Sequence, residues 1–313
     1  MNNVFGIPRK WWPKLHSKNG TISGHNLLQT TKFLFKVIKI KTRLAGARIN
    51  KNSDAVGSVV LNTHSPLGRR NQIIYVEKDD VIYRQILLNG SWGSEESSFL
   101  TSLLKKDSTF IDLGANVGLI TRQLLNSFKS QLKVIVVEPR RQTMINLKAN
   151  LQTFRNNSLY EIHYCQFALG KTDGFTTLYT EENNIGNSSL IYDLAQSKKS
   201  EEIQIMSGKK FERKFLSTST NYVLKSDLQG YDAAVLNQFD DVFWDNVIGG
   251  IIEIWPNEYQ DSIDVRSLLA KLSQRFIFSF SIDFKNPVAA GKIASYWLDP
   301  TLKSQNLFFR MSL

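Results

Sequence analysis

Two glycines and a carboxylate stand in a spacing that can bind a ligand. Asp112, Gly114 and Gly118 form the pattern Asp-x-Gly-x-x-x-Gly, where an apolar segment passes into an amphipathic one. Gly114 allows a tight turn that approaches a ligand closely, Gly118 allows close packing of a helix on a strand, and Asp112 can orient the turn or hold a cationic amino group. The pattern lacks the second close glycine of Gly-x-Gly-x-x-Gly, so it does not predict a pyrophosphate site.

A second carboxylate, Glu138, ends the apolar segment 134–137. A carboxylate at the end of a strand can accept hydrogen bonds from both hydroxyls of a ribose. Because parallel strands end at the same edge of a sheet, the turn at Gly114 and Glu138 are expected to meet there. Together they predict a site for an adenosyl ligand. Its further expected contacts from these segments are Ala115, Asn116 and Pro139.

Two later carboxylates also end apolar segments, Asp227 after 222–226 and Glu253 within 250–254. If these strands are neighbours, the carboxylates face one crevice and could share a proton or a divalent cation. A hydroxyl that attacks an electrophile must lose its proton, and Asp227 is the first choice of base. Asp227 could instead bond the turn at Gly230, and Lys225 could pair with a carboxylate or extend into water.

Apolar and amphipathic segments alternate over most of the chain, which is typical of a doubly wound α/β domain with a seven-stranded, mostly parallel sheet and helices on both faces. Two short strands are expected before this alternation, at 72–76 and 81–88, followed by a helix at 95–104. The seven strands of the sheet are expected at 109–113, 133–137, 161–167, 222–226, 250–254, 276–282 and 307–310. Helices are expected at 117–128, 142–154, 231–239 and 261–274.

A polar insertion, 170–221, interrupts the alternation and predicts β-hairpins and loops that form the wall of an acceptor site. Its neutral donors and acceptors suit sugar hydroxyls or could simply serve turns. They include Asn183, Asn187, Ser188 and Ser189. Aromatic side chains that could stack on a sugar ring, or equally belong to the core, are Trp92, Trp244 and Trp255.

The basic residues are concentrated in an N-terminal arm, 1–70, ahead of the domain expected at 71–313. The net charge is +11, and residues 1–53 contain eleven Lys and Arg and no Asp or Glu, so the remaining chain is balanced. This distribution argues against a nucleic-acid substrate for the domain. A basic amphipathic helix is expected at 25–43. It could pack on the domain, contact an anionic membrane or lipid carrier, or belong to a transit peptide.

The composition predicts a cytoplasmic protein, with peripheral membrane contact through 25–43 as an addition. The single cysteine, Cys165, allows no internal disulfide. The most apolar N-terminal run is interrupted by Lys and Arg, and residues 1–13 lack the apolar centre of a secretory signal.

The sequence also resembles the FkbM family of S-adenosylmethionine-dependent methyltransferases over roughly 72–310. The resemblance rests on five motifs in order: 108–121, Glu138-Pro139, Phe167-Ala168-Leu169-Gly170, Asn187-Ser188-Ser189-Leu190 and 224–231. It implies a Rossmann-like class I methyltransferase fold, S-adenosylmethionine as cofactor, and O-methylation of a glycan or small natural-product acceptor. It also implies cofactor contacts at Phe167 and Ala168 and acceptor contacts at Gln229 and Tyr231. Gln229 and Asp232 depart from the family, which frequently has Glu at both positions.

Two other functions remain open at this point. Methylation of nitrogen in RNA or protein is one, although the Asn-Pro-Pro-aromatic motif of base methyltransferases is missing, because Val288 follows Asn286-Pro287. The other is a non-catalytic adenosyl-binding module that recruits partners through its arm.

Overall fold

The computed structural model describes residues 58–65, 68–77, 80–89, 91–180, 188–190, 199–216, 221–257 and 259–312. The helix expected at 25–43 lies outside these residues, as do Asn183 and Asn187.

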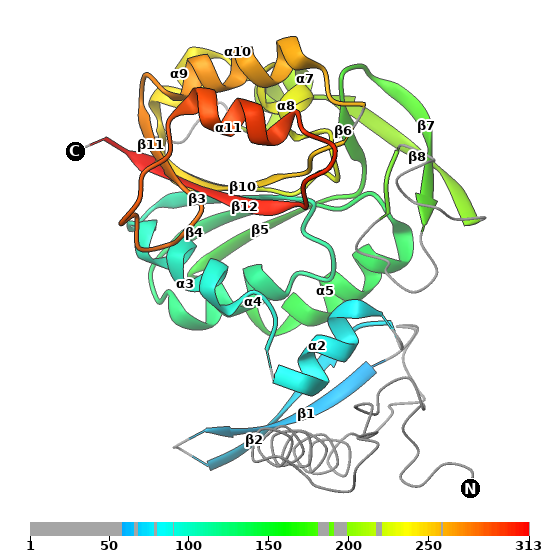
Figure 1. The fold of residues 1–313 in the computed structure, drawn as a ribbon. Coiled ribbons are helices and arrows are strands. Elements are labelled where there is room, and N and C mark those ends of the chain that lie inside the picture. Colours follow the sequence, from blue (N-terminus) through cyan, green and yellow to red (C-terminus); the bar gives the residue numbers. More distant parts are fainter. Residues whose placement is uncertain are drawn as a thin grey trace, which may run out of the picture.

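A seven-stranded sheet forms the centre of the fold (Figure 1), in the order β11-β12-β10-β9-β3-β4-β5. Its strands are β3 (Ser108–Leu113), β4 (Leu132–Val137), β5 (Tyr160–Cys165), β9 (Tyr222–Ser226), β10 (Val247–Ile254), β11 (Phe276–Ser279) and β12 (Gln305–Met311). The strands from β10 to β5 pair in parallel, and β12 is antiparallel to both of its neighbours. The expected doubly wound α/β fold with a seven-stranded, mostly parallel sheet is therefore confirmed.

Helices cover both faces of this sheet (Figure 1). One face carries α3 (Ser94–Leu103), α4 (Leu119–Ser127) and α5 (Arg141–Arg155). The other carries α7 (Gly208–Phe215), α8 (Asp232–Leu236), α9 (Asp241–Asp245), α10 (Ser262–Leu272) and α11 (Ala290–Trp297). In the part of the chain that the structure describes, no helix has the length and apolar character needed to cross a bilayer.

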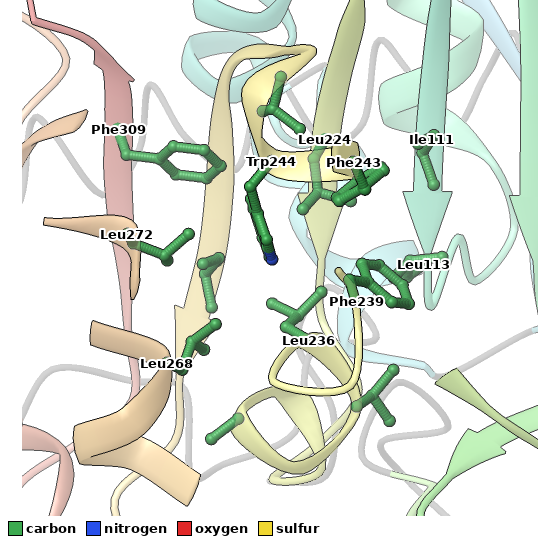
Figure 2. Packing of buried hydrophobic residues seen from close by; sticks show 14 of the residues in the cluster. Ile111, Leu113, Leu224, Leu236, Phe239, Phe243, Trp244, Leu268, Leu272 and Phe309 are labelled. Atoms are coloured by element: carbon green, nitrogen blue, oxygen red, sulfur yellow. The ribbon is translucent and has the colours of Figure 1, made fainter. Parts of the chain in front are cut away.

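Two apolar cores lie on opposite faces because successive strand side chains point to opposite sides. In β3, Ile111 and Leu113 belong to the core under α8 and α10, whereas Phe110 belongs to the core under α3 and α5. Figure 2 shows the first of these cores around Trp244, which is fully buried and packs edge-on against Phe243 at a centroid distance of 5.0 Å. Trp244 is thus a core residue and not a stacking surface for a ligand.

The prediction of a strand at 81–88 is wrong, because Val81–Asn89 forms helix α2. Its β-branched and aromatic composition favours a strand, but Ile82 and Ile86 lie four residues apart and are both buried, as on one face of a helix. The carboxylate of Asp80 accepts a hydrogen bond from the amide of Ile82 at 2.7 Å and so caps the helix start. Burial against Val117 and Leu119 decides the conformation.

A β-hairpin precedes α2 and lies across the expected boundary between arm and domain. It consists of β1 (Ser58–Ser65) and β2 (Gly68–Tyr75). The buried side chain of Asn150 accepts a hydrogen bond from the amide of Tyr75 at 2.7 Å and donates to the carbonyls of Tyr75 and Val117, both at 2.8 Å. Arg122 donates to the carbonyl of Ile73 at 2.6 Å. The hairpin end is therefore fixed to α4 and α5.

A small sheet with strand order β6-β8-β7 begins just before the expected insertion, with β6, and continues within it. Its strands are β6 (Ala168–Gly170), β7 (Gly174–Thr180) and β8 (Lys199–Ser207). The expected hairpin is present, since β7 and β8 pair antiparallel. Helices α7 and α11 were not expected, and the single helix expected at 231–239 is instead the pair α8 and α9.

Replacing Asn150 with alanine tests how the hairpin is attached. Asn150→Ala leaves the buried amide and carbonyl groups it serves unpaired, so we expect the free energy of unfolding to fall by about 2–4 kcal/mol. Urea unfolding measures the change. Gln152→Ala, at an exposed position of the same helix, is the matched control. Equal stability of the two variants would contradict the prediction.

Candidate active site

The carboxyl ends of four strands bring the candidate residues to one edge of the sheet. The last residue of β9, Ser226, pairs with Leu113 of β3 and with Ile252 of β10, and Leu113 pairs with Val137 of β4. The segments that follow these strand ends therefore lie side by side, as the sequence predicted.

The glycine turn after β3 is pressed against the chain that follows β9. Gly114 has φ of +72°, and a Cβ on this residue would lie 1.9 Å from the carbonyl oxygen of Asp227. The amides of Gly114 and Ala115 both donate to the carbonyl of Val137, at 3.0 and 2.9 Å. Only glycine fits both the backbone conformation and the close approach. Gly118, at φ +73°, lies against Leu147 of α5 and serves packing.

Glu138 is a buried carboxylate at the end of β4. Its Oε2 accepts a hydrogen bond from the amide of Asn116 at 3.1 Å, and its Oε1 accepts one from the amide of Arg140 at 2.9 Å. Burial raises the pKa of Glu138 by more than these two hydrogen bonds lower it, so the pKa is about 7. Each carboxylate oxygen keeps acceptor capacity beyond the bond it makes, so the group can still receive a ligand hydroxyl.

A first cavity, here called the adenosyl cavity, opens beside Glu138. Its lining includes residues that the sequence predicted as cofactor contacts: Gly114, Asn116, Glu138, Pro139, Phe167 and Ala168. It also includes Ser188, Ser189 and Gln229, which the sequence predicted for the acceptor instead. The sequence did not single out Thr143, Leu178 or Leu228, which also line it. Of these, Leu178 had a weak signal, since it lies in the hairpin predicted to form a wall.

A second cavity, here called the reaction cavity, shares four lining residues with the first: Gly114, Asn116, Asp227 and Gln229. Ala115, Lys225, Glu253 and Trp92 are further predicted residues that line it. Its remaining wall includes Val81 and Ile82 of α2. The two α2 residues carried no sequence signal, because their segment was taken for a strand.

Lys225 is a buried ammonium that joins the ends of β3 and β9. Its Nζ lies 3.2 Å from Oδ1 of Asp112 and 3.7 Å from Oδ2 of Asp227, and it donates to the carbonyl of Gly114 at 3.1 Å. Burial lowers the pKa of Lys225, but the carboxylates of Asp112 and Asp227 raise it by more, so the pKa stands above its ordinary value. The ammonium therefore stays charged at neutral pH.

Asp112 lies beneath the site, and its carboxylate is 1% exposed. Oδ2 accepts a hydrogen bond from Thr121 at 2.5 Å, and Oδ1 faces Lys225. It is not among the described residues that line either cavity. The sequence placed Asp112 at the cofactor, whereas the structure places it where it positions Lys225.

The carboxylates of Asp227 and Glu253 are bridged by Gln229. The amide nitrogen of Gln229 lies 2.5 Å from Oδ1 of Asp227 and 3.2 Å from Oε2 of Glu253. Burial and the neighbouring Asp227 raise the pKa of Glu253 well above its usual range. Burial raises the pKa of Asp227, but Lys225 and the hydrogen bonds from Glu253 and Gln229 lower it by more, so the pKa lies below its ordinary value. Of the two carboxylates, Glu253 therefore binds a proton more readily, and Asp227 is the one that favours the ionised form.

This arrangement does not fit the divalent cation considered for Asp227 and Glu253. Lys225 already supplies a positive charge beside Asp227, and the Gln229 amide donates to both carboxylates. Within the described residues, no group of three or more His, Cys, Asp or Glu side chains is placed to hold a metal ion.

Asp232 has the structural role that was considered for Asp227. Its Oδ1 accepts hydrogen bonds from Ser226 at 2.5 Å and from the amide of Leu228 at 3.1 Å, and it is buried. Tyr231 precedes α8 and is not among the described residues that line either cavity. The acceptor contact expected of Tyr231 therefore has no support in the cavity geometry.

Substitution of Gly114 tests the close approach of the two loops. Gly114→Ala places a Cβ against the carbonyl of Asp227 and forces a positive φ on alanine, so we expect a loss of roughly 2–4 kcal/mol of unfolding free energy. Thermal and urea unfolding measure it. Gly291→Ala is the control, because nothing lies within 4 Å of its Cβ position. A variant as stable as this control would show that the loops separate without cost.

The sequence is similar to a known protein family and to a protein named as a methyltransferase. Residues 88–252, more than half of the chain, match the family described as Vibrio cholerae RfbT protein. A protein of Beauveria bassiana (strain ARSEF 2860), "Methyltransferase 1", is 24% identical over 165 residues, which cover 47% of this chain and 65% of that protein. The match thus spans just under two thirds of the length of this relative.

Solved structures with a distant likeness include two methyltransferases. A SAM-dependent O-methyltransferase from Thermotoga maritima is 14% identical, with a TM-score of 0.36, over 81% of this chain and 77% of that one. A geranyl diphosphate C-methyltransferase from Streptomyces coelicolor A3(2) is 10% identical, with a TM-score of 0.34, over 76% of this chain and 84% of that one. Because the family model matches more than half of the chain, residues 88–252, the chain belongs to the family described as Vibrio cholerae RfbT protein.

Proposed function

We propose that this protein is an S-adenosylmethionine-dependent O-methyltransferase that acts on a hydroxyl of a carbohydrate or other natural-product acceptor. The observation that carries the proposal is the meeting of two cavities at Gly114 and Asp227. One cavity contains a buried carboxylate suited to a ribose, and the other contains an ionised carboxylate suited to accept a proton. The resemblance to the FkbM family supports the carbohydrate or natural-product acceptor.

The residues of the adenosyl cavity fit the nucleoside part of the cofactor. Glu138 would accept hydrogen bonds from the ribose hydroxyls, and Phe167 and Leu178 provide apolar surface for a flat base. The amino-acid end would lie beside Gly114 and Asp227, which line both cavities. When bound, S-adenosylmethionine supplies an electrophilic methyl group on a positively charged sulfur.

Asp227 is placed to remove the proton of the acceptor hydroxyl. The bound cofactor would supply the methyl group to the hydroxyl oxygen and keep the electron pair of its carbon–sulfur bond, while the hydroxyl proton would pass to a carboxylate oxygen of Asp227. Lys225 and Gln229 hold this carboxylate in place, at 3.7 and 2.5 Å. The raised pKa of Glu253 and the lowered pKa of Asp227 distinguish the two carboxylates, and we assign the role of base to Asp227.

Replacing the proposed base should separate catalysis from binding. In Asp227→Asn we expect kcat to fall by about 10²–10⁴-fold, because the amide cannot accept the proton. Affinity for S-adenosylhomocysteine should stay close to that of the wild type. A panel of glycosides with S-adenosylmethionine, assayed by release of S-adenosylhomocysteine, gives kcat, and calorimetric titration gives the affinity.

The control for this experiment is Glu202→Gln, an exposed position on β8. Full turnover in Asp227→Asn would show that the base is wrongly assigned. Cofactor binding without turnover of any hydroxyl acceptor would contradict the O-methyltransferase proposal.

The raised pKa of Glu138 gives a pH signature for cofactor binding. Ribose hydroxyls donate to the ionised carboxylate. Affinity for S-adenosylhomocysteine should therefore increase as the pH rises toward 7, by up to about tenfold per pH unit, and should level off above pH 7. Glu138→Gln should bind about 10–100-fold more weakly and lose this dependence, because the amide does not titrate. Calorimetric titration from pH 5.5 to 8.5 measures both effects. A dependence that persists in Glu138→Gln would assign it to another group.

A further inference from the structure

Arg140 carries a positive charge that connects three segments around the adenosyl cavity. It follows the end of β4, two residues after Glu138, and its side chain is 18% exposed. Its Nη1 forms an ion pair with Oε1 of Glu77, which lies between β2 and α2. Its Nε lies 3.9 Å from Oε1 of Glu201 in β8. The proposed methyl transfer does not use this cation.

The guanidinium of Arg140 is fixed at one wall of the adenosyl cavity. Nη1 also donates a hydrogen bond to Oγ1 of Thr143 at 3.2 Å, and Thr143 lines the cavity. Its partner Glu77 is held too, because the nearby Tyr75 is bonded to the buried Asn150. An ion pair between side chains that are already held loses little further conformational entropy. The position of the positive charge is therefore well defined.

Arg140 is connected to the ligand site through other residues. Its guanidinium is paired with two carboxylates and bonded to Thr143. Arg140 is not among the described residues that line either cavity. An effect of Arg140 on a ligand must therefore pass through a neighbour.

The neighbour on which Arg140 acts most directly is Glu138. The amide of Arg140 donates to Oε1 of Glu138 at 2.9 Å. Burial raises the pKa of Glu138, whereas the amides of Arg140 and Asn116, and then the guanidinium charge of Arg140, lower it. The carboxylate of Asp227, which follows β9, acts in the opposite sense and raises it. Arg140 thus favours the ionised carboxylate, which has no proton of its own and can accept hydrogen bonds from both ribose hydroxyls.

We propose that Arg140 is a positioning residue for the cofactor, which acts through the carboxylate of Glu138 and is held in place by Glu77. The inference rests on the proposed function, since it takes the adenosyl cavity as the site of S-adenosylmethionine. It adds a residue outside the cavity lining that sets how tightly the cofactor binds at a given pH. It also links the cofactor site to the segment that leads into α2, a helix that lines the reaction cavity.

The pH dependence of S-adenosylhomocysteine affinity tests this role. In Arg140→Met the positive charge is lost, so the pKa of Glu138 should rise, and the pH at which affinity levels off should increase by roughly one unit. Affinity should then fall about tenfold at pH 6 and by less than about twofold at pH 8.5. Arg140→Lys keeps the charge and should recover most of the affinity lost at pH 6. Calorimetric titration from pH 5.5 to 8.5 measures these values.

A double substitution tests whether Arg140 acts through Glu138. Glu138→Gln has no carboxylate to titrate, so adding Arg140→Met to it should change affinity at pH 6 by less than about twofold. Glu77→Gln keeps an acceptor oxygen for Arg140 but removes a negative charge beside it. The midpoint of the pH dependence should therefore move to lower pH in Glu77→Gln, opposite to its shift in Arg140→Met.

The matched control is Arg141→Met, which removes the same charge from the next residue, at an exposed position. Its midpoint should stay within about 0.3 pH units of the wild type, because water screens an exposed charge. Three results would overturn the inference and leave the proposed function intact: an equal loss of affinity at every pH in Arg140→Met, the same loss in the Glu138→Gln background, or a midpoint that rises in Glu77→Gln. If the unaltered protein binds no S-adenosylhomocysteine at any pH, the proposed function fails and the inference with it.

Discussion

The ion pair between Lys225 and Asp112 is the interaction on which the site depends. Both side chains are buried, and a buried charge without a partner is strongly destabilising. Asp112 belongs to β3 and Lys225 to β9, strands that are neighbours in the sheet but separated by the whole insertion in sequence. The ammonium also bonds the carbonyl of Gly114. It therefore fixes the distance between the glycine turn, at which the adenosyl cavity begins, and Asp227, at which the proposed chemistry takes place.

From this pair follows the division of roles between the two outer carboxylates. Lys225 lies 3.7 Å from Asp227, and Gln229 donates to both Asp227 and Glu253. Two carboxylates this close do not both ionise easily, so one pKa is lowered and the other is raised. The position at which the FkbM family frequently has Glu carries Gln229 here, and its amide supplies a donor where a third carboxylate would add repulsion.

Sequence reasoning was accurate where local pattern and burial agree. The strand Tyr222–Ser226 was predicted with its observed bounds, because a run buried on both faces has one stable place in a parallel sheet. It was wrong for α2, where β-branched and aromatic residues favour a strand, and burial of Ile82 and Ile86 on one helical face outweighs that propensity. The 170–221 insertion was predicted in part, since the alternation in β7 and β8 is visible, whereas α7 carries a short and mostly charged sequence.

The sequence by itself determined the glycine turn, the carboxylate at Glu138 and the positions of the seven strands along the chain, because these depend on residue types at short spacing. Only the tertiary structure shows that Asp112 pairs with Lys225, and that helix α2 lines the cavity beside Asp227. Such contacts join residues that are distant in the chain. Their partners follow from how helices and strands pack, and a local sequence pattern does not contain that information.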